Sequence, residues 1–265
     1  MQAAAWQYWK DLSDGLIGAF VLLVTGDAET WSVIRQSLLI SLSATVPSVL
    51  VGVPIGIWMA LTPFRGRTAL LTACNVGYGL PPVVVGLIMS ILLLRHGPLG
   101  FLNLRFTPTA MVIAQFILSC PVMLNLTVAA VQQLHPKLGL QMQSLGASQW
   151  QMLWLFARET RLPLLAAYMA AFGSIISEVG ASVMVGGNLP GSTRVLTTAI
   201  VMETGMGHYD RAMAYGMILL LLVVVVIGTF TLAQQREARP LASRCCTPRG
   251  SVSGVGGGSS WSRVM

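Results

Sequence analysis

The sequence predicts an all-α fold, a helical bundle that crosses the membrane about five times. Only 9% of its 265 residues are charged, whereas soluble domains usually carry about 25%. The mean hydropathy is +0.72, and five apolar stretches reach the roughly 20 residues that a helix needs to cross a bilayer. So few charges cannot cover a globular surface, but they suit a protein surrounded by lipid.

The predicted spans alternate with short polar segments, and two of them contain proline. They cover residues 36–61, 69–94, 107–131, 163–187 and 210–233. The second span contains Pro81 and Pro82, and the third contains Pro121. Proline removes helical hydrogen bonds, which lipid tolerates only where neighbouring helices or a wet cavity satisfy the freed carbonyls. The prolines therefore indicate a packed bundle, in which they act either as packing kinks or in a gate.

Residues 1–35 are predicted to form an N-terminal interfacial segment. The apolar run from Gly15 to Gly26 is too short to span, and Trp6, Tyr8 and Trp9 suit a membrane interface. A secretory signal peptide is a poor match because the run lacks a basic leader and a small-residue cleavage site. The alternative for this run is a sixth, tilted span.

Loop charges predict the orientation of the spans in the cell inner membrane. With five spans, ten of the 16 basic residues fall on one side, whereas the segment through Arg35 has a net charge of −2. The positive-inside rule then places residues 132–162 and the C-terminus in the cytoplasm. A sixth span would move only the N-terminus. Because the basic excess lies in loops and a tail, nucleic-acid binding is not expected.

Residues 234–265 are predicted to be a disordered basic tail, because they contain too little apolar surface to pack. Contact with anionic lipid is the alternative to a dispensable tail. The transmembrane domain accordingly covers residues 36–233, with a long cytoplasmic loop at 132–163.

That loop reads as two short helices joined by a glycine turn. Gly146 suits the left-handed conformation that ends a helix. Ser148, with Gln151 three residues later, predicts a capping box that begins the second helix. This second helix places an apolar ridge on one face, formed by Trp150, Leu153, Trp154 and Ala157. Such a ridge suits the groove of a partner protein.

These residues resemble the EAA loop of ABC importer permeases. The likeness rests on a Leu-Gly-Ala-Ser turn, a tryptophan two residues later and Leu-Pro about sixteen residues after the glycine. The resemblance implies a coupling helix that docks on a separate ATPase subunit. Its expected contacts are Gly146, Ala147, Ser148, Trp150 and Trp154. The chain departs from the family at residues 140–142, where Leu-Gln-Met replaces the usual Glu-Ala-Ala, so the expected glutamate contact is missing.

A second segment, residues 177–205, resembles the oxyanion permeases and most of all those for tungstate, with molybdate and sulfate permeases as alternatives. The resemblance also covers GLPPVVVG at 79–86 and GPLGFLNLRFTPTAMVIAQ at 97–115. It implies a pathway or gate that contains Glu178, Gly180, Pro81 and Pro82. Because a charge inside a span costs roughly 2.5–3.5 kcal/mol, Glu178 must face protein or water. We expect it to hold helices of the gate, or else to be a packing residue, and not to bind the anion.

The end of the fourth span predicts an extracytoplasmic site. Glycine turns and helix starts present N–H groups that suit oxyanions. The expected residues form either an anion funnel or a surface that docks the binding protein: Gly186, Gly187, Asn188, Thr193, Arg194 and Thr197.

The sequence indicates transport and no enzyme chemistry. It has no catalytic acid pair, no metal-ligand spacing and no phosphate-binding glycine loop, so no catalytic residue and no metal site are expected. Neither is a cofactor expected on this chain, because ATP and Mg would be bound by the partner. The expected partners are two ATPase subunits, an extracytoplasmic oxyanion-binding protein, a second copy of the chain and lipid. A channel or scaffold without a motor is the rival function.

Overall fold

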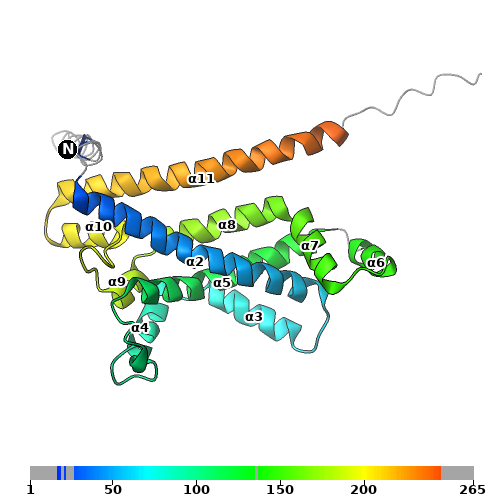
Figure 1. Cartoon of the computed structure of the whole chain (residues 1–265), viewed down its shortest axis with the longest axis horizontal. Helices are drawn as coiled ribbons and strands as arrows, with labels where there is room; N and C mark the ends of the chain where they lie inside the picture. The colour runs from blue at the N-terminus through cyan, green and yellow to red at the C-terminus, as the bar shows by residue number, and fades with distance from the viewer. Residues whose placement is uncertain (1–16, 19–20, 22–26, 135–136, 246–265) are drawn as a thin grey trace, which may run out of the picture.

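The described part of the protein is entirely helical in its regular structure, as the sequence predicts. The structure is a computed structural model that describes residues 17, 18, 21, 27–134 and 137–245, the last nine by their backbone alone. Figure 1 shows the elements packed side by side as a bundle. They are α2 (Ala28–Leu61), α3 (Arg67–Tyr78), α4 (Pro82–Leu92), the 3-10 turn η1 (Gly100–Leu102), α5 (Pro108–Gln132), α6 (Lys137–Ser144), α7 (Gln149–Glu159), α8 (Arg161–Ile176), α9 (Gly180–Gly186), α10 (Leu196–Gly205) and α11 (Tyr209–Cys245).

The bundle has three to five candidate membrane spans among the described residues. Helices α2, α5 and α11 are each long and apolar enough to cross a membrane. Two further spans are bent pairs, α3 with α4 at 96° and α8 with α9 at 57°. The five predicted spans therefore match the structure when each bent pair counts as one span, with one break inside 69–94 and another inside 163–187.

The break in the second span has a clear cause in its sequence. Helix α3 ends at Tyr78, and Pro81 and Pro82 then occupy the N-cap and first position of α4. Proline at a helix start lacks an N–H that would be unbonded there in any case. The two prolines thus begin a new helix and do not kink a continuous one.

Two segment boundaries differ from the prediction. Helix α2 begins at Ala28 and not at 36, because Asp27 caps it: its Oδ2 accepts from the Thr30 amide at 3.1 Å and the Thr30 hydroxyl at 2.7 Å. Helix α11 continues to Cys245, so residues 234–245 are helical and not part of an irregular tail. Its Ala-Gln-Gln-Arg-Glu-Ala stretch consists of good helix formers. Most of the Gly15–Gly26 run and residues 246–265 lie outside the described residues.

Helix α5 lies at the centre of the bundle and packs closely on α2. A Cβ added to Gly56 would lie 2.7 Å from Thr127 Cβ, and one added to Gly52 would lie 2.9 Å from Met123 Cβ. Only residues without a side chain permit this approach. Gly52 and Gly56 therefore permit the close packing of α2 on α5.

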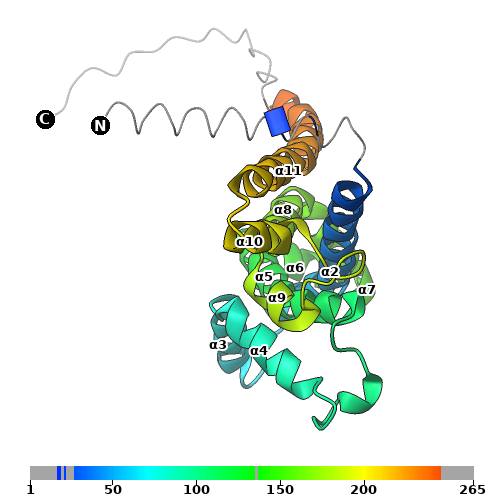
Figure 2. The same ribbon diagram turned by 90° about the vertical axis from the view of Figure 1, so that its left-hand side faces the viewer.

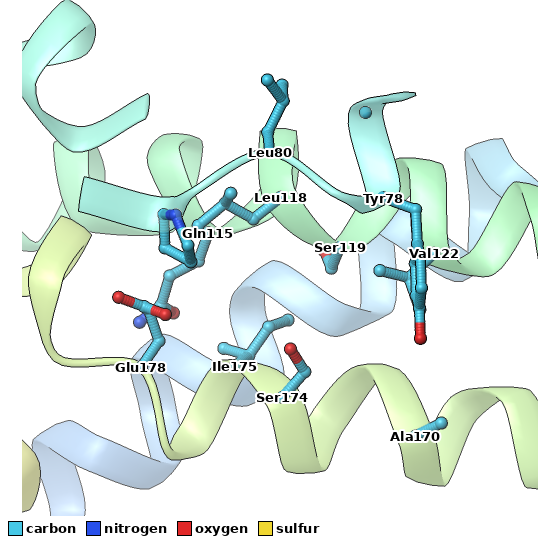
Figure 3. A pocket seen from close by; sticks show the side chains of 12 residues that line it. Tyr78, Leu80, Gln115, Leu118, Ser119, Val122, Ala170, Ser174, Ile175 and Glu178 are labelled. Carbon is cyan, nitrogen blue, oxygen red and sulfur yellow. The ribbon is translucent and has the colours of Figure 1, made fainter. Parts of the chain in front are cut away.

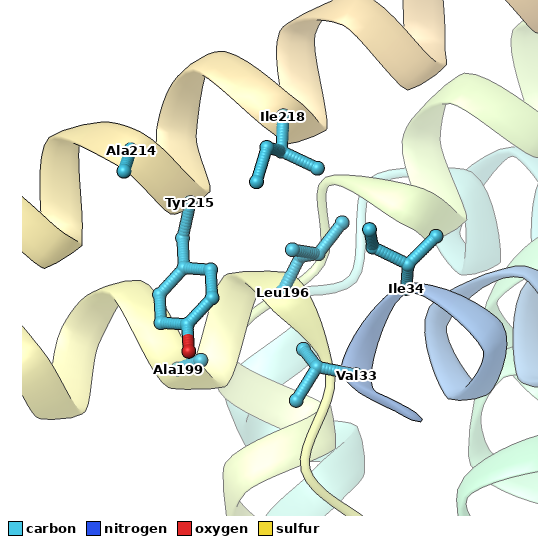
Figure 4. Close-up of a cluster of buried hydrophobic side chains, with 7 residues drawn as sticks. All are labelled: Val33, Ile34, Leu196, Ala199, Ala214, Tyr215 and Ile218. Carbon is cyan, nitrogen blue, oxygen red and sulfur yellow. The ribbon is translucent and has the colours of Figure 1, made fainter. Parts of the chain in front are cut away.

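Helix α11 runs along the outside of the bundle, against α8 and α10 (Figures 1 and 2). One end is fixed by a cluster of buried apolar side chains, shown in Figure 4, that joins α2, α10 and α11. Its members are Val33, Ile34, Leu196, Ala199, Ala214, Tyr215 and Ile218. This contact ties the start of the first long helix to the last one.

Candidate functional site

At one end of the bundle, α6 and α7 form the predicted helix-turn-helix elbow (residues 137–159). Gly146 has φ +74°, the left-handed conformation that glycine adopts without steric cost. The Gly146 amide donates to the Gln143 carbonyl and the Ala147 amide to the Met142 carbonyl, both at 3.0 Å. This is the Schellman arrangement that satisfies the last carbonyls of a helix. The predicted turn is confirmed.

The second helix of the elbow begins as predicted. Ser148 Oγ accepts from the Gln151 amide at 3.3 Å, and Gln151 Oε1 accepts from the Ser148 amide at 2.8 Å. Each residue satisfies a donor that the helix start would leave unpaired. The capping box therefore fixes the direction of α7 relative to the Gly146 turn.

One face of α7 anchors the elbow on the bundle. Met152 and Phe156 are buried against Ile57 of α2 and Val131 of α5. The sequence predicted that Leu153 and Ala157 belong to an exposed ridge. They instead pack against the same cluster. The 100° step between helical residues turns them toward the bundle.

The opposite face of the elbow presents large apolar groups. Trp150 is 79% exposed, Trp154 62% and Leu145 80%. The Arg158 guanidinium lies 5.4 Å from the Trp154 ring centre, which keeps a cation beside the exposed aromatic. An open hollow runs between the Gly146 turn and these rings, lined by Met142, Leu145, Gly146, Ala147, Trp150, Gln151, Trp154 and Leu155. A helix that is anchored by one face and exposes aromatic side chains on the opposite face is typical of a docking surface.

At the other end of the bundle, residues 186–198 form a loop and helix start that we call the hydroxyl loop (Figure 1). Gly187 and Asn188 both have positive φ, +69° and +53°. Thr193 is fully buried, and its hydroxyl donates to the Gly186 carbonyl at 2.6 Å and accepts from the Leu189 amide at 2.9 Å. This one hydroxyl closes the turn from inside.

Three more polar side chains of the hydroxyl loop, those of Thr197, Thr198 and Arg194, also have partners within the protein. The buried Thr197 hydroxyl donates to the Glu178 carbonyl at 3.2 Å, and the Thr198 hydroxyl donates to Asn188 Oδ1 at 2.9 Å. Arg194, whose side chain is only 12% exposed, forms an ion pair with Glu29 of α2.

The Thr193 and Thr197 hydroxyls are thus bonded to main-chain carbonyls, whereas Arg194 Nε is buried without a hydrogen-bond partner among the described residues. The anion funnel stays a prediction. Gly186 is buried too, and a Cβ added to it would lie 2.5 Å from Met111 Sδ. A Cβ on Gly187 would lie 2.6 Å from the Phe106 ring. These glycines permit close packing of the loop, and its docking of a binding protein stays a prediction.

A cavity of about 280 Å³ lies where the bent helix pairs face α5 (Figure 3). It is lined by Gly77, Tyr78, Leu80, Pro82, Gln115, Leu118, Ser119, Val122, Ala170, Ser174, Ile175 and Glu178. Interrupted helices occur at membrane depth only where protein or a wet cavity covers the free backbone groups. The cavity thus lies where the free backbone groups of the two helix breaks need to be covered.

The predicted gate residues meet at this cavity. Glu178 lies between α8 and α9, and its Oε1 accepts from the Ala181 amide at 3.1 Å. Its main-chain carbonyl accepts from the Thr197 hydroxyl of α10 at 3.2 Å. Gly180 packs against Val83 so closely that a Cβ would overlap the valine side chain. Pro82 lines the cavity and Pro81 precedes it, so the structure brings Glu178, Gly180 and the proline pair together.

Two buried polar residues were not predicted from the sequence. Gln115 of α5 lines the cavity and is 3% exposed; its Nε2 lies 3.3 Å from Ser182 Oγ. Glu203 of α10 is buried beside His208, with 3.0 Å between Glu203 Oε2 and His208 Nδ1. A glutamine within the apolar stretch MVIAQFILSC was the available signal for the first. Buried polar groups inside a span mark protein-facing or wet positions.

Known proteins match both the sequence and the fold. The chain is 37% identical over 211 residues to the tungstate uptake system permease protein TupB of Peptoclostridium acidaminophilum, covering 80% of this chain and 92% of the relative. It is 38% identical over 200 residues to a probable anion ABC transporter permease protein of Haloferax volcanii, covering 74% and 86%. A chain of the inward-facing MetNI methionine ABC transporter superimposes with a TM-score of 0.62 at 17% identity, over 81% of this chain and 98% of that chain.

The family model of binding-protein-dependent transport system inner membrane components matches residues 52–238. This range includes the elbow, both helix breaks, the cavity and the hydroxyl loop. The chain is an integral membrane protein of the ABC permease fold, and it belongs to the family of binding-protein-dependent transport system inner membrane components.

Proposed function

We propose that this chain is the permease subunit of an ATP-driven importer for a tetrahedral oxyanion, with tungstate as its substrate. The observation that carries this function is the elbow, which buries Met152 and Phe156 in the bundle and exposes Trp150 and Trp154. A rigid connection from an exposed surface to the transmembrane helices can transmit movement of a bound ATPase. The substrate is inferred from the tungstate uptake permease of Peptoclostridium acidaminophilum, to which the chain is 37% identical.

The ATPase binds ATP and Mg, and two copies of it engage the elbows of two permease copies. One permease copy leaves the cavity open, because Tyr78, which lines it, is 61% exposed. A second copy related by two-fold symmetry would close the pathway. The elbow and the C-terminus then face the cytoplasm, and the hydroxyl loop faces an extracytoplasmic binding protein.

Uptake in proteoliposomes tests the proposed function. The full-length chain would be reconstituted with the ATPase and the binding protein of its importer, and uptake of tungstate, molybdate and sulfate would be measured with and without ATP. We expect ATP-dependent uptake with tungstate preferred. Preference for molybdate or sulfate would change the substrate, and ion flux that needs no ATP would favour the channel alternative.

A further inference from the structure

Gln115 presents an unused polar group in the cavity beside the helix breaks. Its side chain is buried, and in the described part of the chain its Oε1 has no hydrogen-bond partner. A buried acceptor without a partner is costly, and native proteins contain few of them. Figure 3 shows Gln115 extending from α5 toward the end of the cavity where Glu178 lies.

Rotating the side-chain amide of Gln115 by 180° gives its oxygen a hydrogen-bond partner. If the oxygen and nitrogen of Gln115 exchange places, Ser182 Oγ can donate to the amide oxygen at the same 3.3 Å separation. Amide oxygen and nitrogen are assigned from their hydrogen bonds. The NH2 group then occupies the position without a partner and offers donors to a ligand in the cavity.

A second donor faces Gln115 across the cavity. The Ser174 hydroxyl projects from α8 into the space that Figure 3 shows between α8 and α5. Of the described residues that line the cavity, none is Lys or Arg, and Glu178 is the one acid. A single water needs about 10–15 Å³ of such space, so about 280 Å³ admits an oxyanion with part of its hydration shell.

We propose that this cavity is the transit site of the oxyanion, where the Gln115 amide and the Ser174 hydroxyl donate to the anion and the Glu178 carboxylate shortens its stay. The inference rests on the proposed function and adds the binding groups. Neutral donors supply directed hydrogen bonds without a countercharge, and like charges in a partly dry site repel. A conducting site must release what it binds, which a strong cationic site would prevent.

Glu178→Gln is the central variant, because the glutamine oxygen can still accept from the Ala181 amide while the charge is removed. The intact complex of permease and ATPase, free of nucleotide and binding protein, would be titrated with radiolabelled molybdate and with tungstate as competitor. We expect the Glu178→Gln complex to bind molybdate at least tenfold more tightly than wild type, and to turn over more slowly in uptake. Asp210→Asn, at the exposed start of α11, is the matched control and should change neither quantity.

Gln115→Leu and Ser174→Ala, each added to Glu178→Gln, test the donors. We expect the first to weaken molybdate binding at least tenfold and the second about threefold, with Gln133→Leu at the exposed end of α5 as the control. Unchanged molybdate binding in Glu178→Gln, with normal wild-type uptake, would overturn the transit site. If Gln115→Leu does not assemble, unchanged binding in the Ser174→Ala complex would overturn it. A wild-type complex that takes up no oxyanion would instead refute the proposed function.

Discussion

The elbow and the hydroxyl loop lie at opposite ends of the bundle, and the sequence predicts both as partner surfaces. In the elbow, the largest apolar side chains point outward, and Trp150 and Trp154 are 79% and 62% exposed. In the hydroxyl loop, the groups that could bind an anion point inward. Thr193 bonds within the loop, and Arg194 pairs with Glu29 of α2.

The difference shows that composition alone does not identify a binding surface. Threonine and arginine near a glycine turn suit an oxyanion, but the same donors also satisfy the carbonyls of an irregular loop that lipid or protein covers. Tryptophan on a short amphipathic helix suits a core, yet here the buried face of α7 is filled by Met152 and Phe156. The elbow therefore exposes its largest aromatic groups, as the proposed ATPase contact requires, whereas the hydroxyl loop joins α10 to α2 through the Arg194–Glu29 ion pair.

The largest expected effect comes from Gly146→Val in the elbow. Nothing lies within 4 Å of an added Cβ, so only the backbone conformation at φ +74° resists the change. A β-branched residue is a genuine outlier there. We expect the turn to open and ATP-coupled uptake to fall at least tenfold, while membrane insertion stays normal. Gly146→Asn is the control, because asparagine tolerates positive φ; normal coupling in Gly146→Val would remove the elbow from the mechanism.

Trp150→Ala tests the exposed side of the comparison. The side chain covers little of its own chain, so thermal stability should change by no more than about 0.5 kcal/mol. Removal of an aromatic anchor from an interface costs about 2 kcal/mol or more, roughly a thirtyfold loss of affinity. Titration of purified permease with the ATPase measures this loss. Trp31→Ala, on the 51%-exposed tryptophan of α2, should leave the affinity unchanged, and an equal loss in both variants would contradict a specific contact.

Thr193→Val tests the internal role of the hydroxyl loop. Valine has the shape of threonine but leaves the Gly186 carbonyl and the Leu189 amide without their partner. We expect a loss of about 2 kcal/mol in the free energy of unfolding, measured by thermal denaturation in detergent. Thr204→Val on the exposed face of α10 should cost much less. A stable Thr193→Val protein that fails to engage its binding protein would make the loop a docking surface after all.

The smallest expected effect concerns the cap that begins α2, next to the Glu29–Arg194 ion pair. The Thr30 hydroxyl and amide donate to Asp27 and hold the pKa of its carboxyl below the ordinary value of 3.8. The stabilisation is therefore present above pH 3.8 and is lost as the pH falls through the lower folded-state pKa. Asp27→Ala should lower stability by about 1 kcal/mol near neutral pH, and the difference should shrink below that pKa. A pH-independent difference would contradict the cap.

The elbow could be predicted in detail because its bonds are local. The hydrogen bonds that shape it join Gly146 to Gln143, Ala147 to Met142 and Ser148 to Gln151. Each closes within five residues, so residue types and spacing in a short segment specify it. The all-α class and the apolar stretches are local in the same sense, since each helix satisfies its own backbone.

The cavity beside the helix breaks could be predicted only in part. Glu178 and the proline pair are conspicuous because they are costly within a span, whereas Gln115 is a neutral residue whose partner Ser182 lies 67 positions away. The break between α8 and α9 contains no proline, so no local signal separates it from a continuous helix. Its geometry depends on the contact of Gly180 with Val83 of α4.

The sequence by itself determined that this protein is a helical membrane bundle with a glycine-hinged elbow, because hydropathy and short-range hydrogen bonding act within each segment. Only the tertiary structure decided which way the polar side chains of the hydroxyl loop point. Arg194 and Glu29 are 165 positions apart, and they meet because α2 passes beside the loop. The sequence places a charged or hydroxyl side chain in the loop, but tertiary packing decides whether that side chain bonds to a neighbouring residue or to another molecule.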